Sequence, residues 1–272
     1  MKLWGFDLGR IDCSSTKYIK SLPKNIPTVE WLWDEMDRIW DELELDNTKR
    51  LSEQAIGQFY SHPIWLVNGV FTAKDEVSKN HRVAVANYLE RLCVNNVADY
   101  GGGFGELALT IISQLPNSQV EIVEPYPSET GLNRISKCER ISIVKDLKAN
   151  HYQAIIAQDV LEHVEQPIEL AYELAKSVQK DGYVIFLNCF YPVIKCHLPA
   201  TFHLRYNFKS VMRSMGLDYI GTIPGAEHGL VFRKTQSISL LQAKRAERVS
   251  NFTGLIKNIF YPVFGNIKRK LQ

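Results

Sequence analysis

The fold of this chain follows from the stretch Val97-Ala98-Asp99-Tyr100-Gly101-Gly102-Gly103-Phe104-Gly105-Glu106-Leu107. Two apolar residues and an aspartate lead into four glycines within five positions, and apolar residues at helical spacing continue to Leu115. This order predicts a strand, a tight turn and the start of a helix, because glycine permits the sharp backbone turn. The first N–H groups of such a helix are free to bind a ligand.

The spacing of the glycines favours one class of ligand over another. In a dinucleotide-binding fingerprint that starts at Gly101, the third glycine would fall at position 106, where this chain has Glu106. A glutamate there would face a pyrophosphate, which argues against NAD. The pattern D-x-G-x-G-x-G is filled by Asp99, Gly101, Gly103 and Gly105, and in it the sequence resembles the class I S-adenosylmethionine-dependent methyltransferases. In that family the loop holds the methionine part of the cofactor, so the resemblance implies S-adenosylmethionine.

Carboxylates follow the predicted strands at one edge of the sheet. Strands are predicted at 119–124, 141–144, 153–158 and 183–188, and Glu124 ends the first of these, where a carboxylate accepts ribose hydroxyls. The resemblance places Asp146 at the adenine and Asp159 beside the cofactor. The cofactor-binding residues expected from these observations are Asp99, Tyr100, Gly101, Gly103, Gly105, Glu124, Pro125, Asp146, Leu147, Asp159 and Val160.

Strands that alternate with helices predict the fold class. Helices are predicted at 167–178 and 207–215, and the last strands, 217–222 and 229–232, form an antiparallel hairpin with Glu227 and His228 in its turn. We expect a Rossmann-like, doubly wound α/β fold whose seven-stranded sheet is mostly parallel, with helices on both faces.

The N-terminal region predicts a helical cap. Residues 1–27 show no period and are interpreted as an irregular arm, and helices are predicted at 28–45, 50–60 and 77–92. The apolar stretch 63–71 is interpreted as a buried segment over the cofactor. The tryptophans at positions 31, 33 and 40 either pack the cap or line a substrate pocket, and packing is favoured. The expected domains are an arm and cap at 1–80, a cofactor-binding domain at 81–235 and a tail at 236–272.

The run D-V-L-E-H-V at 159–164 resembles the fourth motif of small-molecule methyltransferases of the ubiquinone-biosynthesis type. If this run is helical, Asp159, Glu162 and His163 share one face. Some relatives hold a divalent ion with similar runs, whereas a charged first helical turn is the alternative. Because the first acid is an aspartate, as in metal-free relatives, we predict no metal. Candidate catalytic residues are His163, His197, His203 and Tyr206, and His228 is a further candidate base.

Composition limits the class of protein. The formal net charge of +2 and the lack of a basic patch with interleaved aromatics argue against nucleic acid as a partner. Five scattered cysteines without C-x-x-C spacing indicate reduced thiols and argue against a zinc site. The start lacks a signal-peptide pattern and no apolar window spans a bilayer, so we expect a cytoplasmic protein.

The tail carries seven basic residues against the single acid Glu247. Apolar residues from Leu255 to Ile267 follow helical spacing, interrupted by Pro262. Such a segment lies on an anionic membrane surface or docks on its own domain or a second subunit, and docking is favoured. A monomer and a homodimer both remain open.

These observations predict an S-adenosylmethionine-dependent methyltransferase with a small-molecule acceptor. The sequence leaves open whether oxygen, carbon or nitrogen is methylated. The alternatives are an NAD-type oxidoreductase on a Rossmann fold and a non-catalytic module that binds S-adenosylmethionine.

Overall fold

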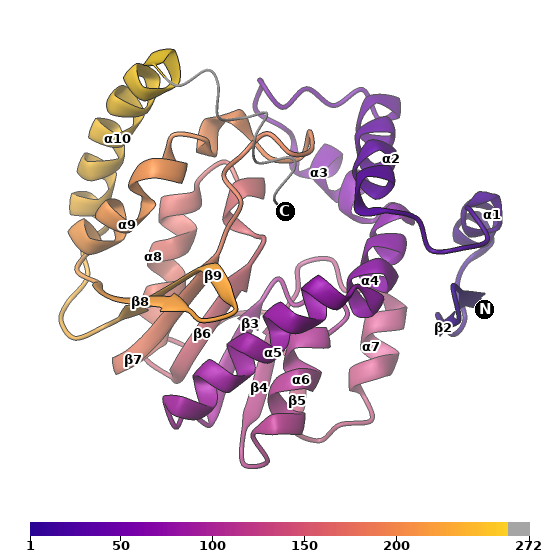
Figure 1. Cartoon of the computed structure of the whole chain (residues 1–272), viewed down its shortest axis with the longest axis horizontal. Coiled ribbons are helices and arrows are strands. Elements are labelled where there is room, and N and C mark those ends of the chain that lie inside the picture. Colours follow the sequence, from indigo (N-terminus) through magenta and orange to yellow (C-terminus); the bar gives the residue numbers. More distant parts are fainter. Residues whose placement is uncertain (261–272) are drawn as a thin grey trace.

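The computed structural model describes residues 1–260, and the side chains of residues 1–251 (Figure 1). The strands are β1 (Lys2–Leu3), β2 (Phe6–Asp7), β3 (Asn96–Tyr100), β4 (Gln119–Val123), β5 (Ile141–Ile143), β6 (Tyr152–Gln158), β7 (Val178–Leu187), β8 (Asp218–Ile223) and β9 (Ala226–Arg233). The first helices are α1 (Cys13–Ser21), α2 (Val29–Glu42), α3 (Glu53–Tyr60), α4 (Ile64–Lys74) and α5 (Glu76–Arg91). The later helices are α6 (Glu106–Gln114), α7 (Glu129–Ile135), η1 (Leu161–His163), α8 (Pro167–Ser177), η2 (Pro199–Thr201), α9 (Leu204–Met215) and α10 (Leu240–Phe260), where η marks a 3₁₀ helix.

Seven strands form one sheet in the order β5-β4-β3-β6-β7-β9-β8. All neighbours from β5 to β7 are parallel, and β9 is antiparallel to both β7 and β8. The predicted seven-stranded, mostly parallel fold and its terminal hairpin are confirmed. The predicted turn is wrong, because β9 already pairs with β8 at Ala226 and therefore includes Glu227 and His228.

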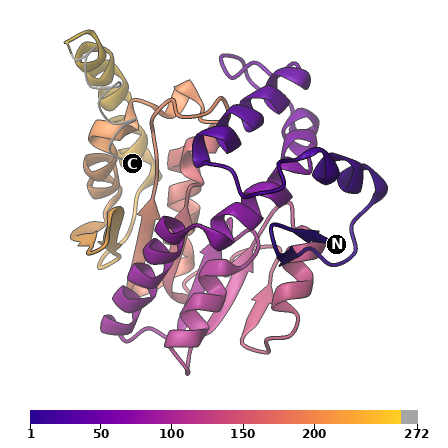
Figure 2. The same ribbon diagram turned by 45° about the vertical axis from the view of Figure 1, so that its right-hand side comes forward.

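The strands bury both of their faces, as parallel strands between two helical layers do. On β6, Ile155 packs into the core beneath α8 and α9, whereas Ile156 packs into the core beneath α5 and α6. Figure 2, turned by 45°, shows the sheet between these two layers. This arrangement leaves the carboxyl ends of β3, β4 and β6 as the open edge where a ligand binds.

The N-terminal region is more ordered than predicted. Residues 1–27 form the hairpin of β1 and β2 and the helix α1, so the interpretation as an irregular arm is wrong. The Asp12 side chain accepts the Ser15 N–H and caps α1. Leu8 and Ile19 join a third apolar core with residues of α2 and α4, which anchors the segment.

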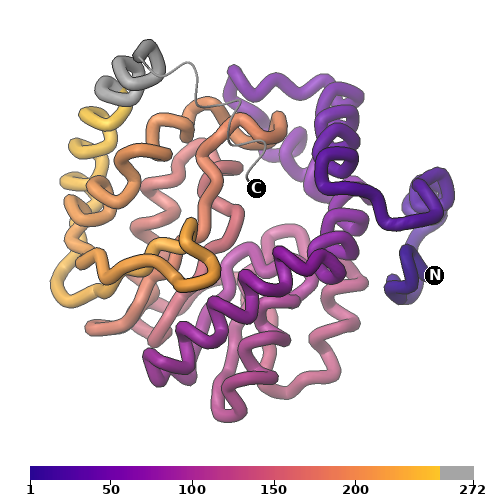
Figure 3. Tube along the Cα trace, in the orientation of Figure 1, coloured from indigo at the N-terminus to yellow at the C-terminus, as the bar shows by residue number. Residues whose placement is uncertain are grey.

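The C-terminal helix α10 packs along α9 and α8. Ala243 and Ser250 are buried there, and the Lys244 ammonium pairs with the Glu169 carboxylate at 2.8 Å. Figure 3 shows the N-terminal segment and the described part of α10 at opposite sides of the molecule. The predicted apolar stripe from 255 to 267 lies outside the described side chains. Among the described residues, no helix is both long and apolar enough to cross a membrane.

Candidate active site

The glycine loop between β3 and α6 is shaped by left-handed backbone. Gly101, Gly103 and Gly105 have φ of +77°, +51° and +77°. A Cβ at Gly101 would lie 2.7 Å from Val160 Cγ2, and one at Gly105 would lie 2.5 Å from Ile135 Cγ2. A Cβ at Gly103 would meet nothing within 4 Å. Gly101 and Gly105 therefore permit close packing within the protein, whereas Gly103 leaves open space for a ligand.

The two carboxylates of the loop region lie in different surroundings. Glu124 accepts the N–H groups of Gly103 at 2.9 Å and Tyr126 at 3.1 Å, and so ties the end of β4 to the loop. Asp99 is only 2% exposed, and its Oδ2 has no hydrogen-bond partner among the described residues. Burial, and then the charge of Glu124, raise the pKa of Asp99 to about 7.

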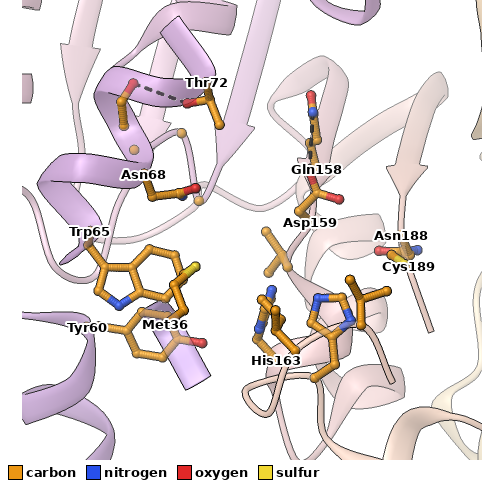
Figure 4. A pocket seen from close by; sticks show the side chains of 18 of the residues that line it. Met36, Tyr60, Trp65, Asn68, Thr72, Gln158, Asp159, His163, Asn188 and Cys189 are labelled. Carbon is orange, nitrogen blue, oxygen red and sulfur yellow. Dashed lines mark hydrogen bonds between the residues drawn. The ribbon is translucent and has the colours of Figure 1, made fainter. Parts of the chain in front are cut away.

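A cavity of about 2150 Å³ opens over this edge of the sheet. One wall comes from the loop and the strand ends and the other from the cap helices, as Figure 4 shows with Tyr60 and Trp65 facing His163 and Asp159. The predicted cofactor-binding residues that line it are Asp99, Tyr100, Gly101, Gly103, Glu124, Pro125, Asp159 and Val160. Of the candidate catalytic residues, His163, His197, Tyr206 and His228 line it.

Four predicted site residues lie outside the lining. Asp146 is exposed beyond β5, and neither it nor Leu147 reaches the cavity surface in this structure. Gly105 lies behind the loop against Ile135 and shapes the start of α6. His203 also lies outside the cavity lining, because this side chain is covered by α10, with Nε2 3.7 Å from Glu247 Oε1.

Two imidazoles meet at the side of the cavity formed by η1 and the segment after β7. The rings of His163 and His197 have centroids 4.8 Å apart. His163 Nδ1 lies 3.0 Å from the Cys196 carbonyl oxygen, and His197 Nδ1 lies 2.7 Å from that of Tyr191. Since a carbonyl only accepts, both Nδ1 atoms carry the proton and donate. Burial lowers the pKa of His197, and burial with the His197 charge lowers the pKa of His163 to about 3.

Glu162 lies beside the imidazoles and is fully buried. Its Oε1 accepts the Cys189 N–H at 2.8 Å, and its Oε2 has no hydrogen-bond partner among the described residues. Burial, and then the charge of Asp159, raise the pKa of Glu162 to about 8. One potential ligand atom each from Glu162, His163 and His197 lie within 4.8 Å of one another.

Asp159 does not share a face with Glu162 and His163, contrary to the helical arrangement considered from the sequence. Asp159 has φ of +52°, and only Leu161–His163 forms a turn of 3₁₀ helix. Asp159 Oδ2 instead lies 3.4 Å from the Gln158 amide nitrogen. The group that could hold a metal therefore includes His197 in place of Asp159.

The segment that carries His197 is fixed to the cap. The Asp37 carboxylate of α2 accepts the Lys195 N–H at 2.6 Å, and the Asn47 amide donates to the Lys195 carbonyl at 2.7 Å. The Leu198 N–H donates to the Glu162 carbonyl at 2.8 Å. The cap and η1 thus hold this segment from two sides.

Several lining residues were missed by sequence reasoning. The ring of Tyr60 stacks on Tyr126 and lies 4.7 Å from that of Trp65, and His81 lies 4.8 Å from His228. Asn188, at the end of β7, has both amide atoms buried without a described partner. The stretch 63–71 is buried as predicted, but it forms the helix α4, which was not predicted. Of the tryptophans, Trp33 lines the cavity, whereas Trp40 packs on Phe59 in the core. The contacts of Tyr60 with Tyr126 and of His81 with His228 join segments far apart in the chain, so no local pattern marks them.

Comparison with known proteins places this site in a family. Residues 69–219 match the model of a family described as a methyltransferase domain. Human N-acetylserotonin methyltransferase, solved with S-adenosylmethionine, is 18% identical with a TM-score of 0.55, and the match covers 82% of this chain and 70% of that one. The CurJ carbon methyltransferase is 12% identical with a TM-score of 0.51 and the same coverage.

An O-methyltransferase family 2 protein from Planctomyces limnophilus, solved with apigenin, is 15% identical with a TM-score of 0.41. The match covers 53% of this chain and 52% of that protein, so the chain spans about half its length. No curated protein sequence shows significant similarity to the chain. The family model covers more than half of the chain, which therefore belongs to the methyltransferase-domain family of S-adenosylmethionine-dependent methyltransferases.

Proposed function

We propose that this enzyme transfers the methyl group of S-adenosylmethionine to a hydroxyl oxygen of a small molecule that has an aromatic or apolar body. The observation that carries this proposal is one cavity with a glycine loop on one side and two neutral imidazoles on the other. The run Asp159 to Val164 supports a place in the ubiquinone-biosynthesis-like branch.

The loop side fits the cofactor, which supplies an electrophilic methyl group on a sulfonium. The space in front of Gly103 admits a ligand against the backbone. Glu124 lines the same cavity, and its carboxylate oxygens can accept the ribose hydroxyls. Asp146 and Leu147 keep their proposed role at the adenine only if the segment after β5 moves toward the cavity.

The opposite side fits an acceptor with a proton to lose. In-line transfer requires the nucleophile to be aligned with the methyl group. The imidazoles of His163 and His197 line the cavity on this side. Tyr60 and Trp65 provide flat apolar surface, and the buried Asn188 amide has hydrogen bonds to offer to a polar group of the acceptor.

Two measurements on the full chain test this function. Calorimetry should show binding of S-adenosylhomocysteine. In an assay with a panel of phenols, amines and carbon acids, the enzyme should release S-adenosylhomocysteine only with the hydroxylated compounds. Binding of NAD(H) without S-adenosylhomocysteine would return the chain to the oxidoreductase alternative. Binding of S-adenosylhomocysteine with no turnover on any acceptor class would favour the non-catalytic module.

We propose that only the last part of the C-terminal tail contacts a membrane. Because one face of α10, with Ala243, Lys244 and Ser250, packs on the domain, we place any membrane contact after residue 251. Attraction to an anionic surface adds about 1 kcal/mol per basic residue. The intact chain should sediment with anionic vesicles at low salt only, and a chain cut after residue 251 should not. A soluble monomer or homodimer that ignores vesicles would leave the tail with no membrane role.

A further inference from the structure

The side chains of Glu162, His163 and His197 form a cluster at the acceptor side of the cavity. His163 and Glu162 come from η1, and His197 comes from the segment after β7. These three are the one group of possible metal ligands that meets within 4.8 Å among the residues described.

Both imidazoles have one ring nitrogen fixed by the backbone. Each Nδ1–H is held by a backbone carbonyl, of Cys196 for His163 and of Tyr191 for His197. The proton on Nδ1 leaves Nε2 with a lone pair in the neutral ring. Backbone carbonyls that fix Nδ1–H in this way are the outer partners that metal-bound histidines have in proteins.

Glu162 supplies an observation independent of the histidines. Its side chain is fully buried, Oε1 is held by the Cys189 N–H, and Oε2 has no hydrogen-bond partner among the described residues. Leaving a buried carboxylate oxygen unpaired is costly, so such an oxygen indicates a missing partner.

We propose that Glu162, His163 and His197 bind a divalent transition-metal ion, with Zn²⁺ as the best match. Two nitrogens and one carboxylate oxygen favour such an ion over Mg²⁺ or Ca²⁺, which prefer oxygen ligands alone. Three protein ligands leave an open position, as in catalytic zinc sites. The site contains no cysteine ligand, so the lack of C-x-x-C spacing in the sequence does not argue against it. The sequence alone had predicted a site without metal.

The role of the ion rests on the proposed function, whereas its binding does not. At the open position the ion would hold the acceptor oxygen and lower the pKa of its hydroxyl. The hydroxyl proton leaves to solvent, the new bond joins oxygen to the methyl carbon, and the breaking bond returns its electron pair to sulfur. Charge therefore balances without an oxidant or reductant.

Metal binding is tested on the full chain after removal of metal with a chelator. Titration with Zn²⁺ against a chromophoric chelator should show one ion bound per chain, and excess Mg²⁺ should not displace it. Co²⁺ in the same site should give the visible absorption of a four- or five-coordinate ion. Glu162→Gln and His197→Asn should each weaken Zn²⁺ binding by about 100-fold or more, since even outer partners are worth up to that.

His203→Asn is the matched control, because this histidine is buried outside the cavity and should leave Zn²⁺ affinity unchanged. Circular dichroism and the binding of S-adenosylhomocysteine show whether each variant is folded. If the wild-type chain binds S-adenosylhomocysteine but not Zn²⁺, or if Glu162→Gln and His197→Asn bind Zn²⁺ as the wild type does, the metal site is wrong. Failure to bind S-adenosylhomocysteine would instead count against the proposed function.

Discussion

The two sides of the cavity are built in different ways. The loop side, where we propose that the cofactor binds, is built mainly on one continuous segment, residues 99–105, with Glu124 added from the end of β4. The shape of the segment comes from left-handed glycines and from close packing on Val160 and Ile135. The acceptor side joins η1, the segment after β7 and the cap, held by hydrogen bonds to backbone groups. Substitutions in the loop should change stability and cofactor affinity, because they alter backbone conformation and burial. Substitutions on the acceptor side should change acceptor binding, because the side chains there lose the hydrogen bonds that position them.

The largest expected effect is at Asp99 and depends on pH. The pKa of this carboxyl is raised from 3.8 to about 7, so its contribution to stability is present below pH 4 and is lost as the pH rises through 7. An asparagine at this position cannot ionise, so Asp99→Asn should be more stable than the wild type at pH 8 by up to about 4 kcal/mol. Urea unfolding at pH 4, 6 and 8 without ligand measures this. Equal stability at pH 8 would show that Asp99 is not buried as described, and Asp146→Asn, at an exposed site, should follow the wild type throughout.

The next effect separates two glycines with the same handedness of backbone. Gly105→Ala should lower the free energy of unfolding by about 3 kcal/mol, because it adds a clash with Ile135 to the left-handed strain. Gly103→Ala carries only the strain, about 1–2 kcal/mol, but its methyl occupies the ligand space. Urea unfolding and calorimetry with S-adenosylhomocysteine report the two losses. If Gly103→Ala binds the ligand normally, the loop does not hold the cofactor.

Glu124 tests the side chains of the cofactor side. Glu124→Ala should weaken S-adenosylhomocysteine binding by about 1–3 kcal/mol, because the ribose hydroxyls lose their acceptor and Gly103 N–H its partner. Asp146→Ala is the comparison, and its expected effect in calorimetry is small because it lies outside the cavity. An equal loss of S-adenosylhomocysteine affinity in both variants would support the proposed contact of Asp146 with the adenine. No loss in a folded Glu124→Ala chain would remove Glu124 from the site.

The smallest effect tests the anchoring of the acceptor side. Asp37→Ala removes the acceptor of the Lys195 N–H and should cost about 1–2 kcal/mol in positioning the segment that carries His197. We expect a roughly tenfold higher KM for the acceptor with unchanged affinity for S-adenosylhomocysteine. Asp34→Ala, at an exposed position of the same helix, controls for the loss of charge. A change in cofactor affinity instead would show that the two sides are coupled through the cap.

The sequence by itself determined the layers of the fold and the glycine turn between β3 and α6. Alternating strands and helices require a mostly parallel sheet, and the D-x-G-x-G-x-G spacing is local, so one segment carries both the turn and its ligand space. The prediction of an irregular arm at 1–27 was wrong. The short hairpin and helix there are stabilised by burial in a core made with α2 and α4, which the local sequence does not show.

Only the tertiary structure decided the acceptor side. The run Asp159 to His163 suggested a shared helical face, but the positive φ of Asp159 turns it away, and His197 takes its place beside Glu162. His203 and His197 look alike in sequence, yet α10 covers one and the cavity exposes the other. Which histidines meet depends on how segments more than 30 residues apart pack together. Helical or strand periodicity relates only residues that are close in the sequence, so it cannot predict such a contact.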